Sequence, residues 1–450
     1  MSIYTRVIST LIFPLHEKLK RHSTVSVRER MEETQWWTKE QLKSLQLERL
    51  QKLISSVYSH VPYYRKVLQE QGLKPADFTA LEDLQKLPLL TKNIIRAHTE
   101  ELKADNAKEL ARFNTGGSTG EPLIFFIGKE RVSHDVAAKW RATRWWGVDI
   151  GDPEIVVWGS PIELGSQDRV REIRDQMLRT KLIPAFEMSE ENLNRFIEEI
   201  RSFNPKMLFG YPSSLSLIAQ HAQKQGVRLD DLNIKVAFVT SERLYDDQRK
   251  NIEQTFGCPV ANGYGGRDAG FIAHQCPEGG MHITVEDVIV EIVDKNGSIQ
   301  QPGAAGEVVI THLATQEFPF IRYRTGDVAV LDDQACSCGR GLPLLKDIQG
   351  RTTDFIIAAD GTAMHGLALI YVIRDLEGVS DFKIIQQSLS VIDVQIVPDN
   401  QYQNGIDEAI RQGFKKRLGQ GVTINVEKVD QIASEKSGKY RYVMSKVLVQ

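Results

Sequence analysis

The sequence predicts an α/β fold: a large N-terminal domain of doubly wound mixed sheets with a small antiparallel β region, then a small C-terminal α+β domain. The main observation is that between about 110 and 260 short apolar runs alternate with helical patterns, which is typical of parallel strands joined by crossover helices. The chain has 450 residues, of which 41% are hydrophobic and 26% charged. That length and composition suit a globular protein of two or three domains.

The first part of the chain, residues 1–105, is predicted to be a helical lead-in. Thr38 and Gln41 have the spacing of a capping box. Apolar residues then recur at helical spacing, at Leu42, Leu45, Leu50, Leu53, Ile54 and Val57. Breaks are expected at Pro62 and in LPLLTK at 87–92.

The apolar run VISTLIF at 7–13 is far short of the ~20 residues that a membrane span needs. It also has no small-residue cleavage site after it. We therefore expect a docked or mobile N-terminal segment rather than a span or a targeting signal, and a cytoplasmic protein.

The parallel strands are expected at IVVW (155–158), in MLFGY (207–211) and in VAFVTSE (236–242). Ligands bind beyond the carboxyl ends of the strands in such sheets. The stretches GYPSS, TSE and NGYGG are expected at this edge.

The character of the sequence changes at 282–331, where HITVEDVIVEIV and GEVVITHL alternate apolar and polar residues around a turn at 295–297. This pattern predicts antiparallel strands. A second change at IQGR places a domain boundary near 350. The prediction is a domain of residues 1–349 and a small mobile domain of residues 350–450, with a hinge near 350–354, strands near FKIIQQ and VIDVQIV, and a helix around 405–418.

Charge and cysteine content exclude some classes of protein. The net charge is −3, from 56 basic and 59 acidic residues, so nothing favours a nucleic-acid partner. Four cysteines in a chain of this size do not make a disulfide framework.

The stretch FNTGGSTGEP at 113–122 is rich in glycine and hydroxyl residues. Glycines let backbone N–H groups approach an anion, and hydroxyls add donors. The last glycine is not followed by the lysine of a nucleotide-binding P-loop. On spacing alone, a mobile surface loop and a phosphate site are equally good interpretations.

Five motifs in order resolve this ambiguity. They are TGGSTG at 115–120, GYGGRD at 263–268, YRTGD at 323–327, GRTTD at 350–354 and SGK at 437–439. In order and rough spacing they resemble the adenylate-forming superfamily, and VPYYR, LPLLTK, GYPSSL and CSCGR also resemble its phenylacetate–CoA ligase branch, including CapK-like proteins of polysaccharide clusters. The resemblance covers nearly the whole chain.

The resemblance implies a two-step reaction. A carboxylate attacks the α-phosphate of ATP to give an acyl-adenylate and pyrophosphate, and a thiol, usually that of coenzyme A, then displaces AMP. It assigns Lys439 to the α-phosphate and the attacking carboxylate, Asp327 to the ribose hydroxyls and Asp268 to Mg²⁺. The complete set implied for ATP or AMP is Thr115, Gly116, Gly117, Ser118, Thr119, Gly120, Ser241, Glu242, Asn262, Gly263, Tyr264, Gly265, Asp327 and Arg351.

Candidates for the acyl pocket are Tyr211, Ser213 and Ser214, with Phe209 beside them. The two serines could equally be helix N-caps. An aromatic wall suits an aryl or planar acid, and Glu242 leaves room for an amino or hydroxy acid.

Two positions depart from the family pattern. Asp268 stands where the family usually has Glu, and it is one methylene shorter on the way to Mg²⁺. Thr353 stands at the usual hinge position, where many relatives have an acidic residue.

A metal site is predicted beside the chemistry. Cys276 in HQCPEGGMH and Cys336 and Cys338 in CSCGR would converge if the intervening strands fold back. Thiolates with one imidazole make a tetrahedral structural zinc site, and the fourth ligand would be His282, which we prefer, or His274. Reduced cysteines in a turn are the alternative, and the resemblance to a branch with zinc-containing members favours zinc.

Three functions follow from this reading. The first is an ATP-dependent acid–CoA ligase acting on a small carboxylic acid. The second is an adenylyl- or acyltransferase of polysaccharide or cofactor biosynthesis with an acceptor other than coenzyme A. The third is a non-catalytic nucleotide-binding protein, which Asp268 and Thr353 would support. A monomer or a homodimer is expected.

Overall fold

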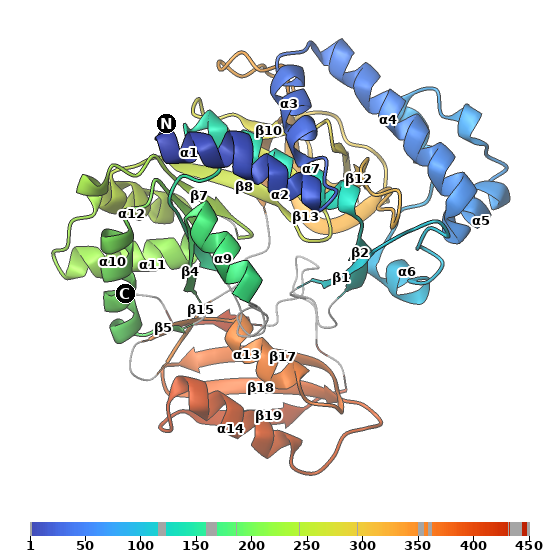
Figure 1. Ribbon diagram of the computed structural model, residues 1–450. Coiled ribbons are helices and arrows are strands. Elements are labelled where there is room, and N and C mark those ends of the chain that lie inside the picture. The colour runs from blue at the N-terminus through green and yellow to red at the C-terminus, as the bar shows by residue number, and fades with distance from the viewer. Residues whose placement is uncertain are drawn as a thin grey trace.

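The computed structural model describes residues 2–115, 123–158, 169–185, 187–242, 244–294, 296–349, 355–358, 362–430, 432 and 443–447. Figure 1 shows a large α/β part that contains both halves of the main sheet, with a smaller sheet and its two helices, α13 and α14, below it. The predicted α/β class with a small C-terminal α+β part is confirmed.

Helices fill the first hundred residues, as predicted. They are α1 (Ile3–Val7), the π-helical turn η1 (Ile8–Ile12), α2 (Phe13–Leu19), α3 (Thr24–Thr34), α4 (Lys39–His60), α5 (Pro62–Glu70), the 3-10 turns η2 (Pro75–Asp77) and η3 (Leu81–Lys86), and α6 (Lys92–Ala97). The capping box is confirmed: the Gln41 N–H donates to the Thr38 hydroxyl at 3.3 Å, and the Thr38 N–H donates to the Gln41 side chain at 3.0 Å. Among the described helices, none is long and apolar enough to cross a membrane.

The large part is organised around one mixed sheet of eleven strands, in the order β11-β12-β13-β14-β10-β9-β8-β7-β6-β3-β4. Its parallel strands are β3 (Glu154–Trp158), β4 (Thr180–Pro184), β6 (Met207–Gly210), β7 (Val236–Thr240) and β8 (Val260–Gly266). Its antiparallel strands are β9 (Gly270–Gln275), β10 (Met281–Ile283), β11 (Val288–Val293), β12 (Ala305–His312), β13 (Tyr323–Asp332) and β14 (Leu344–Gln349).

The antiparallel strands were predicted correctly in kind, but two details differ. They continue the parallel sheet through the β8–β9 pair instead of forming a separate β region. The stretch at 282–293, expected as one alternating strand, is divided between β10 and β11 by a turn at 284–287. The N–H groups of Asp287 and Val288 both donate to the Thr284 carbonyl oxygen. These hydrogen bonds bend the chain and end the first strand.

Both faces of the parallel strands are covered, as a doubly wound sheet requires. The helices α10 (Glu190–Phe203), α11 (Pro212–Lys224) and α12 (Asp246–Phe256) share one hydrophobic cluster with the sheet, and α7 (Lys129–Trp145) shares another. Along β7, Ala237 and Val239 belong to the first cluster, and Val236 and Phe238 to the second. This alternation follows from the two-residue period of a strand. The remaining elements of the large part are β1 (Ala111–Asn114), β2 (Ile124–Ile127), α9 (Arg169–Leu178), β5 (Glu187–Met188) and η4 (Asp230–Leu232).

The C-terminal part has its own hydrophobic cluster, drawn from residues 356–443. Its elements are β15 (Phe355–Ile357), β16 (Ala363–His365), α13 (Leu367–Arg374), β17 (Val379–Ser388), β18 (Val391–Pro398), α14 (Ile406–Leu418), β19 (Thr423–Lys428) and β20 (Val443–Ser445). The strands predicted at FKIIQQ and VIDVQIV and the helix at 405–418 are β17, β18 and α14. β16 also pairs with β5 of the large part. The hinge predicted at 350–354 lies outside the described residues.

Candidate active site and metal centre

The predicted phosphate loop connects β1 to β2, and these two strands pair antiparallel as a hairpin. At its base the Thr115 N–H donates to the Leu123 carbonyl at 3.0 Å, and the Leu123 N–H donates to the Thr115 hydroxyl at 3.0 Å. The strand β2 follows the loop. Gly116, Gly117, Ser118, Thr119 and Gly120 lie outside the described residues, so a phosphate cradle there stays a prediction.

The GYGGRD motif forms the end of β8 and the turn into β9. The expectation that NGYGG follows a strand was wrong, because β8 extends to Gly266 and contains Asn262, Gly263, Tyr264 and Gly265. Glycine is required at 265, where a Cβ would lie 2.2 Å from the Gly270 carbonyl oxygen. The turn at 267–269 joins the two closely paired strands β8 and β9.

The two predicted carboxylates, Asp268 and Asp327, each accept a hydrogen bond from a tyrosine. In both cases the tyrosine belongs to the sequence motif that contains the other carboxylate. The Tyr264 hydroxyl donates to Asp327 Oδ2 at 3.2 Å, and the Tyr323 hydroxyl donates to Asp268 Oδ2 at 2.5 Å. The motifs at 263–268 and 323–327 therefore form one site. Sequence reasoning assigned no role to Tyr323, although the YRTGD motif contained the signal.

The turn that carries Asp268 is fixed by a buried cation that the sequence analysis did not find. The Arg131 guanidinium donates to the carbonyl oxygens of Arg267 at 3.3 Å and of Asp268 at 3.4 Å. Arg131 is buried on α7 and also pairs with Asp135 at 2.9 Å. The Asp268 Oδ1 atom accepts from the Ala269 N–H at 3.1 Å. Nothing in the local sequence marked Arg131 for this role, because the two carbonyl groups that it holds lie more than a hundred positions away.

The predicted acyl-pocket residues lie where β6 and β7 end. Ser213 and Ser214 are in the first turn of α11, and the Ser213 hydroxyl donates to Glu242. The alternative that these serines cap the helix is wrong, since Tyr211 is the N-cap residue and makes no side-chain cap bond. Ser241, just after β7, has a positive φ of 74°, a backbone conformation that costs energy for a residue with a Cβ.

An aromatic wall stands beside these residues. The Tyr211 ring stacks on Trp158 with 4.4 Å between centroids, and Trp158 in turn faces Phe209 at 6.0 Å. Trp158 is the last residue of the predicted strand IVVW, and its position at a strand end was the available signal. A flat apolar surface of this kind suits a planar or branched acyl group.

Two cations assigned from the motifs, Arg351 and Lys439, lie outside the described residues. Thr353 does too. Their roles stay predictions.

The metal ligands predicted from the sequence converge. One atom each from Cys276, His282, Cys336 and Cys338 lies within 4.8 Å of all the others. The Cys276 and Cys336 sulfurs are 3.6 Å apart, and Cys338 Sγ is 3.2 Å from His282 Nε2. This cluster of ligand atoms, which we call the thiol–imidazole cluster, arises because β10 pairs with both β9 and β14.

The surroundings orient these ligands. His282 Nδ1 lies 3.2 Å from the Leu342 carbonyl, so a proton on Nδ1 donates there and leaves the Nε2 lone pair facing the sulfurs. Burial lowers the pKa of His282 to about 4, which keeps the ring neutral. Burial and the adjacent Cys336 raise the pKa of the Cys276 thiol to about 12. Gly280 is required, because a Cβ there would lie 2.6 Å from Cys336 Sγ.

His274, the alternative fourth ligand, is not part of the cluster. It stacks on Phe271 at 5.3 Å and lies 5.8 Å from the Phe238 ring. Burial lowers its pKa to about 3. The structure thus places His274 in the core and His282 among the sulfurs.

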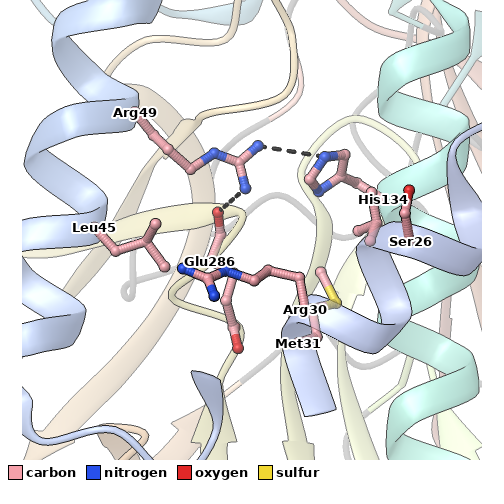
Figure 2. A pocket seen from close by; sticks show the side chains of 8 residues that line it. Ser26, Arg30, Met31, Leu45, Arg49, His134 and Glu286 are labelled. Carbon is pink, nitrogen blue, oxygen red and sulfur yellow. Dashed lines mark hydrogen bonds between the residues drawn. The ribbon is translucent and has the colours of Figure 1, made fainter. Parts of the chain in front are cut away.

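A cavity of about 170 Å³ lies elsewhere, between α3, α4 and α7, and contains none of the predicted site residues. Figure 2 shows Arg49 reaching both the Glu286 backbone and His134. Arg49 donates to the Glu286 carbonyl at 2.5 Å and lies 3.3 Å from His134 Nε2, while His134 Nδ1 bonds to Asp287. These groups bond to one another, so the arrangement ties the helical lead-in to the sheet.

Comparisons with known proteins agree with the motifs. The chain is 30% identical to the phenylacetate–coenzyme A ligase of Thermus thermophilus over 71% of this chain and 72% of that enzyme. It is 25% identical to Protein CapK of Staphylococcus aureus over 90% of this chain and 89% of that protein. Residues 356–446 match the family model of the CapK C-terminal domain.

Solved structures share the fold. Two structures of 2-hydroxyisobutyryl-CoA ligase with 2-HIB-AMP and CoA give TM-scores of 0.60 in the open conformation and 0.66 in the thioesterification state. They cover 91% and 92% of this chain, and 92% and 91% of theirs, at 19% and 20% identity.

Proposed function

The chain belongs to the phenylacetate–coenzyme A ligase family of adenylate-forming enzymes, and from that premise we propose that it activates a small carboxylic acid with ATP and then forms a thioester with coenzyme A. The observation that carries the proposal is the cross-pairing of Tyr264 with Asp327 and of Tyr323 with Asp268. The two hydrogen bonds fix the carboxylates that would serve the nucleotide and its metal. Arg131 also holds the turn that carries Asp268.

The first step forms a bond between an acid oxygen and the α-phosphorus of ATP and releases pyrophosphate. Negative charge gathers on the phosphates, so the site must supply fixed donors and cations rather than a nucleophile. Thr115 and the loop after it would bind the β- and γ-phosphates, and Arg351 and Lys439 would supply positive charge. Asp327 would accept from the ribose hydroxyls while Tyr264 holds its other lone pairs in place.

Mg²⁺ would neutralise phosphate charge when it is bound. Asp268 fits that ion: each of its oxygens accepts one hydrogen bond, and a carboxylate offers about four lone-pair directions, so room for a metal remains. Tyr323 would orient the shorter Asp268 side chain toward the metal.

We also propose that the thiol–imidazole cluster binds one zinc ion with a structural role. Three sulfurs and one imidazole nitrogen are a preferred zinc ligand set. The orientation of His282 through the Leu342 carbonyl supports this assignment. Four protein ligands leave no open coordination position, so the metal would take no part in acid activation.

The decisive experiment is pyrophosphate–ATP exchange over a panel of aryl, amino, hydroxy and fatty acids. Exchange that depends on one class of acid, followed by thioester formation with coenzyme A, would establish the proposal. ATP binding without exchange for any acid would favour a non-catalytic nucleotide-binding protein instead.

A second candidate is transfer of the acyl or adenylyl group to an acceptor other than coenzyme A, as in polysaccharide or cofactor assembly. One observation supports it: the match to Protein CapK extends over 90% of the chain, whereas the ligase match covers 71%. AMP retained on the product would identify adenylyl transfer. Released AMP without a coenzyme A thioester would identify acyl transfer to another acceptor, and released AMP with the thioester would identify ligation. Either reaction would need ATP and the cluster would need reduced thiols, so we propose that the protein acts in the cytoplasm.

A further inference from the structure

The elements α1, η1 and α2 follow one another without a break and form one N-terminal helix of residues 3–19. This helix has an apolar face that the described part of the protein leaves uncovered. Five of the twelve large hydrophobic side chains that are exposed in the described chain lie on it, with 42–86% of their surface exposed: Ile3, Val7, Leu11, Leu15 and Leu19. We call this set the outer face. Scattered apolar residues are normal on a protein surface, but a contiguous group of this size marks an interaction site.

The helix is fixed to the large domain by its other side. Ile8 and Phe13 are buried, and Phe13 packs edge-on against Trp140 with 5.2 Å between centroids. Thr5 donates to Asp152 at 2.7 Å. Glu17 is buried and accepts from Thr24. The inner side thus holds the helix in place, and the outer face is presented to its surroundings.

The π-helical turn η1 keeps the outer face in one line. Ile3, Val7, Leu11, Leu15 and Leu19 follow each other at intervals of four residues. In a regular α-helix each such interval advances by about 40°, so five residues would wind about 160° around the axis. A π turn has more residues per turn and reduces this winding. η1 lies between Val7 and α2 and so aligns the two halves of the stripe.

The exposed charged side chains of residues 3–21 are all positive, and no exposed carboxylate lies within this segment. Arg6, Lys18, Lys20 and Arg21 are exposed, whereas the carboxylate of this segment, Glu17, is buried. An apolar helix face bordered by Lys and Arg is suited to the interface of an anionic bilayer, where the apolar side chains enter the acyl boundary and the cations meet the headgroups. A second copy would bring like charges together.

We propose that the outer face of residues 3–21 binds the surface of an anionic lipid bilayer, with the helix lying parallel to the membrane plane. Figure 1 shows α1 and α2 running along the large part, away from the C-terminal sheet with α13 and α14. Membrane contact through this helix leaves the C-terminal part clear of the lipid. The enzyme would then work at the membrane surface, on acids or acceptors that reside there.

The test is co-sedimentation of the full chain with vesicles of phosphatidylcholine plus phosphatidylglycerol, and with phosphatidylcholine alone. Wild type should pellet with the anionic vesicles and dissociate as salt is raised. Leu11→Asp combined with Leu15→Asp should lower partitioning by on the order of tenfold or more. Lys18→Glu, Lys20→Glu and Arg21→Glu together should lower it by on the order of a hundredfold on anionic vesicles.

Leu389→Asp is the matched control, because Leu389 is an exposed leucine of the C-terminal part. This variant should pellet as wild type does. Absence of wild-type pelleting, or equal pelleting of the leucine variant, would overturn the proposal. A wild-type dimer that becomes monomeric in the leucine variant, without lipid binding, would assign the outer face to a second copy instead.

Discussion

The thiol–imidazole cluster and the proposed nucleotide site are built on neighbouring strands of one sheet, yet their functional atoms are arranged differently. In the cluster, the ligand atoms of Cys276, His282, Cys336 and Cys338 face one another within 4.8 Å. In the nucleotide site, the carboxylates of Asp268 and Asp327 are each held by one tyrosine, and the other assigned groups come from distant parts of the chain.

From this difference we expect the thiol–imidazole cluster to stabilise the fold and the proposed nucleotide site to carry the reaction. The four ligand atoms of the cluster already lie together without substrate, so losing one of them should cost stability. A site whose cations would come from Arg351 and Lys439 would be completed only by the nucleotide and the C-terminal domain, so losing a member should cost activity. Variants that separate these two outcomes test the comparison.

The largest expected effect is on activity. Lys439→Ala should lower pyrophosphate–ATP exchange by on the order of a thousandfold, about 4 kcal/mol, because a cation at the α-phosphate offsets charge that develops in the transition state. ATP binding by calorimetry should stay nearly unchanged, as should the Tm. Lys446→Ala, an exposed lysine of the same segment, is the control. Unchanged exchange in the Lys439 variant would refute its role.

The next effect should be on stability alone. Cys338→Ser, or removal of the metal by a chelator, should lower the Tm by about 4 °C, since about 3 kcal/mol of folding free energy is lost with a structural metal. Exchange measured well below the Tm should not change. Metal analysis should find about one zinc per chain in wild type.

Cys258→Ser is the control for this variant, because Cys258 is a buried cysteine outside the cluster. It should keep the metal. If gently purified wild type contains no zinc, the assignment of the cluster is wrong.

The third effect tests the departure from the family pattern. Asp268→Asn should lower exchange about a hundredfold and weaken its dependence on Mg²⁺, since the charge that meets the metal is removed. Asp268→Glu should keep exchange within a few-fold of wild type, because the family usually has Glu there. If the Asn variant matches wild type, Asp268 does not serve the metal.

The sequence was sufficient to predict the elements whose signals are local. The capping box of Thr38 and Gln41 and the parallel strands could be predicted, because periodicity and capping depend on residues close in sequence. The four members of the thiol–imidazole cluster could be listed, but their convergence depends on the pairing of β10 with β14, which no local signal gives.

Contacts between distant segments were not predictable. The pairing of Tyr323 with Asp268 and the buried Arg131 depend on how α7 and β13 lie against the β8–β9 turn. The extent of β8 was misjudged because glycines usually end strands, whereas Gly265 here permits the close approach of β9. Similarly, the apolar run at 7–13 gave no sign that a π turn would align it with Leu15 and Leu19.

The smallest expected effect asks whether the tyrosines belong with the site or with the fold. Tyr264→Phe removes a single 3.2 Å hydrogen bond to Asp327 and keeps the ring, which costs about 1 kcal/mol. We expect the KM for ATP to rise about fivefold, with kcat and Tm unchanged. Tyr323→Phe, which removes the 2.5 Å bond to Asp268, should instead raise the Mg²⁺ concentration needed for half-maximal exchange. If either variant instead lowers the Tm and leaves the KM for ATP unchanged, the hydrogen bond of that tyrosine supports the sheet, as we propose for the thiol–imidazole cluster. The distinction between the two regions would then fail at that residue.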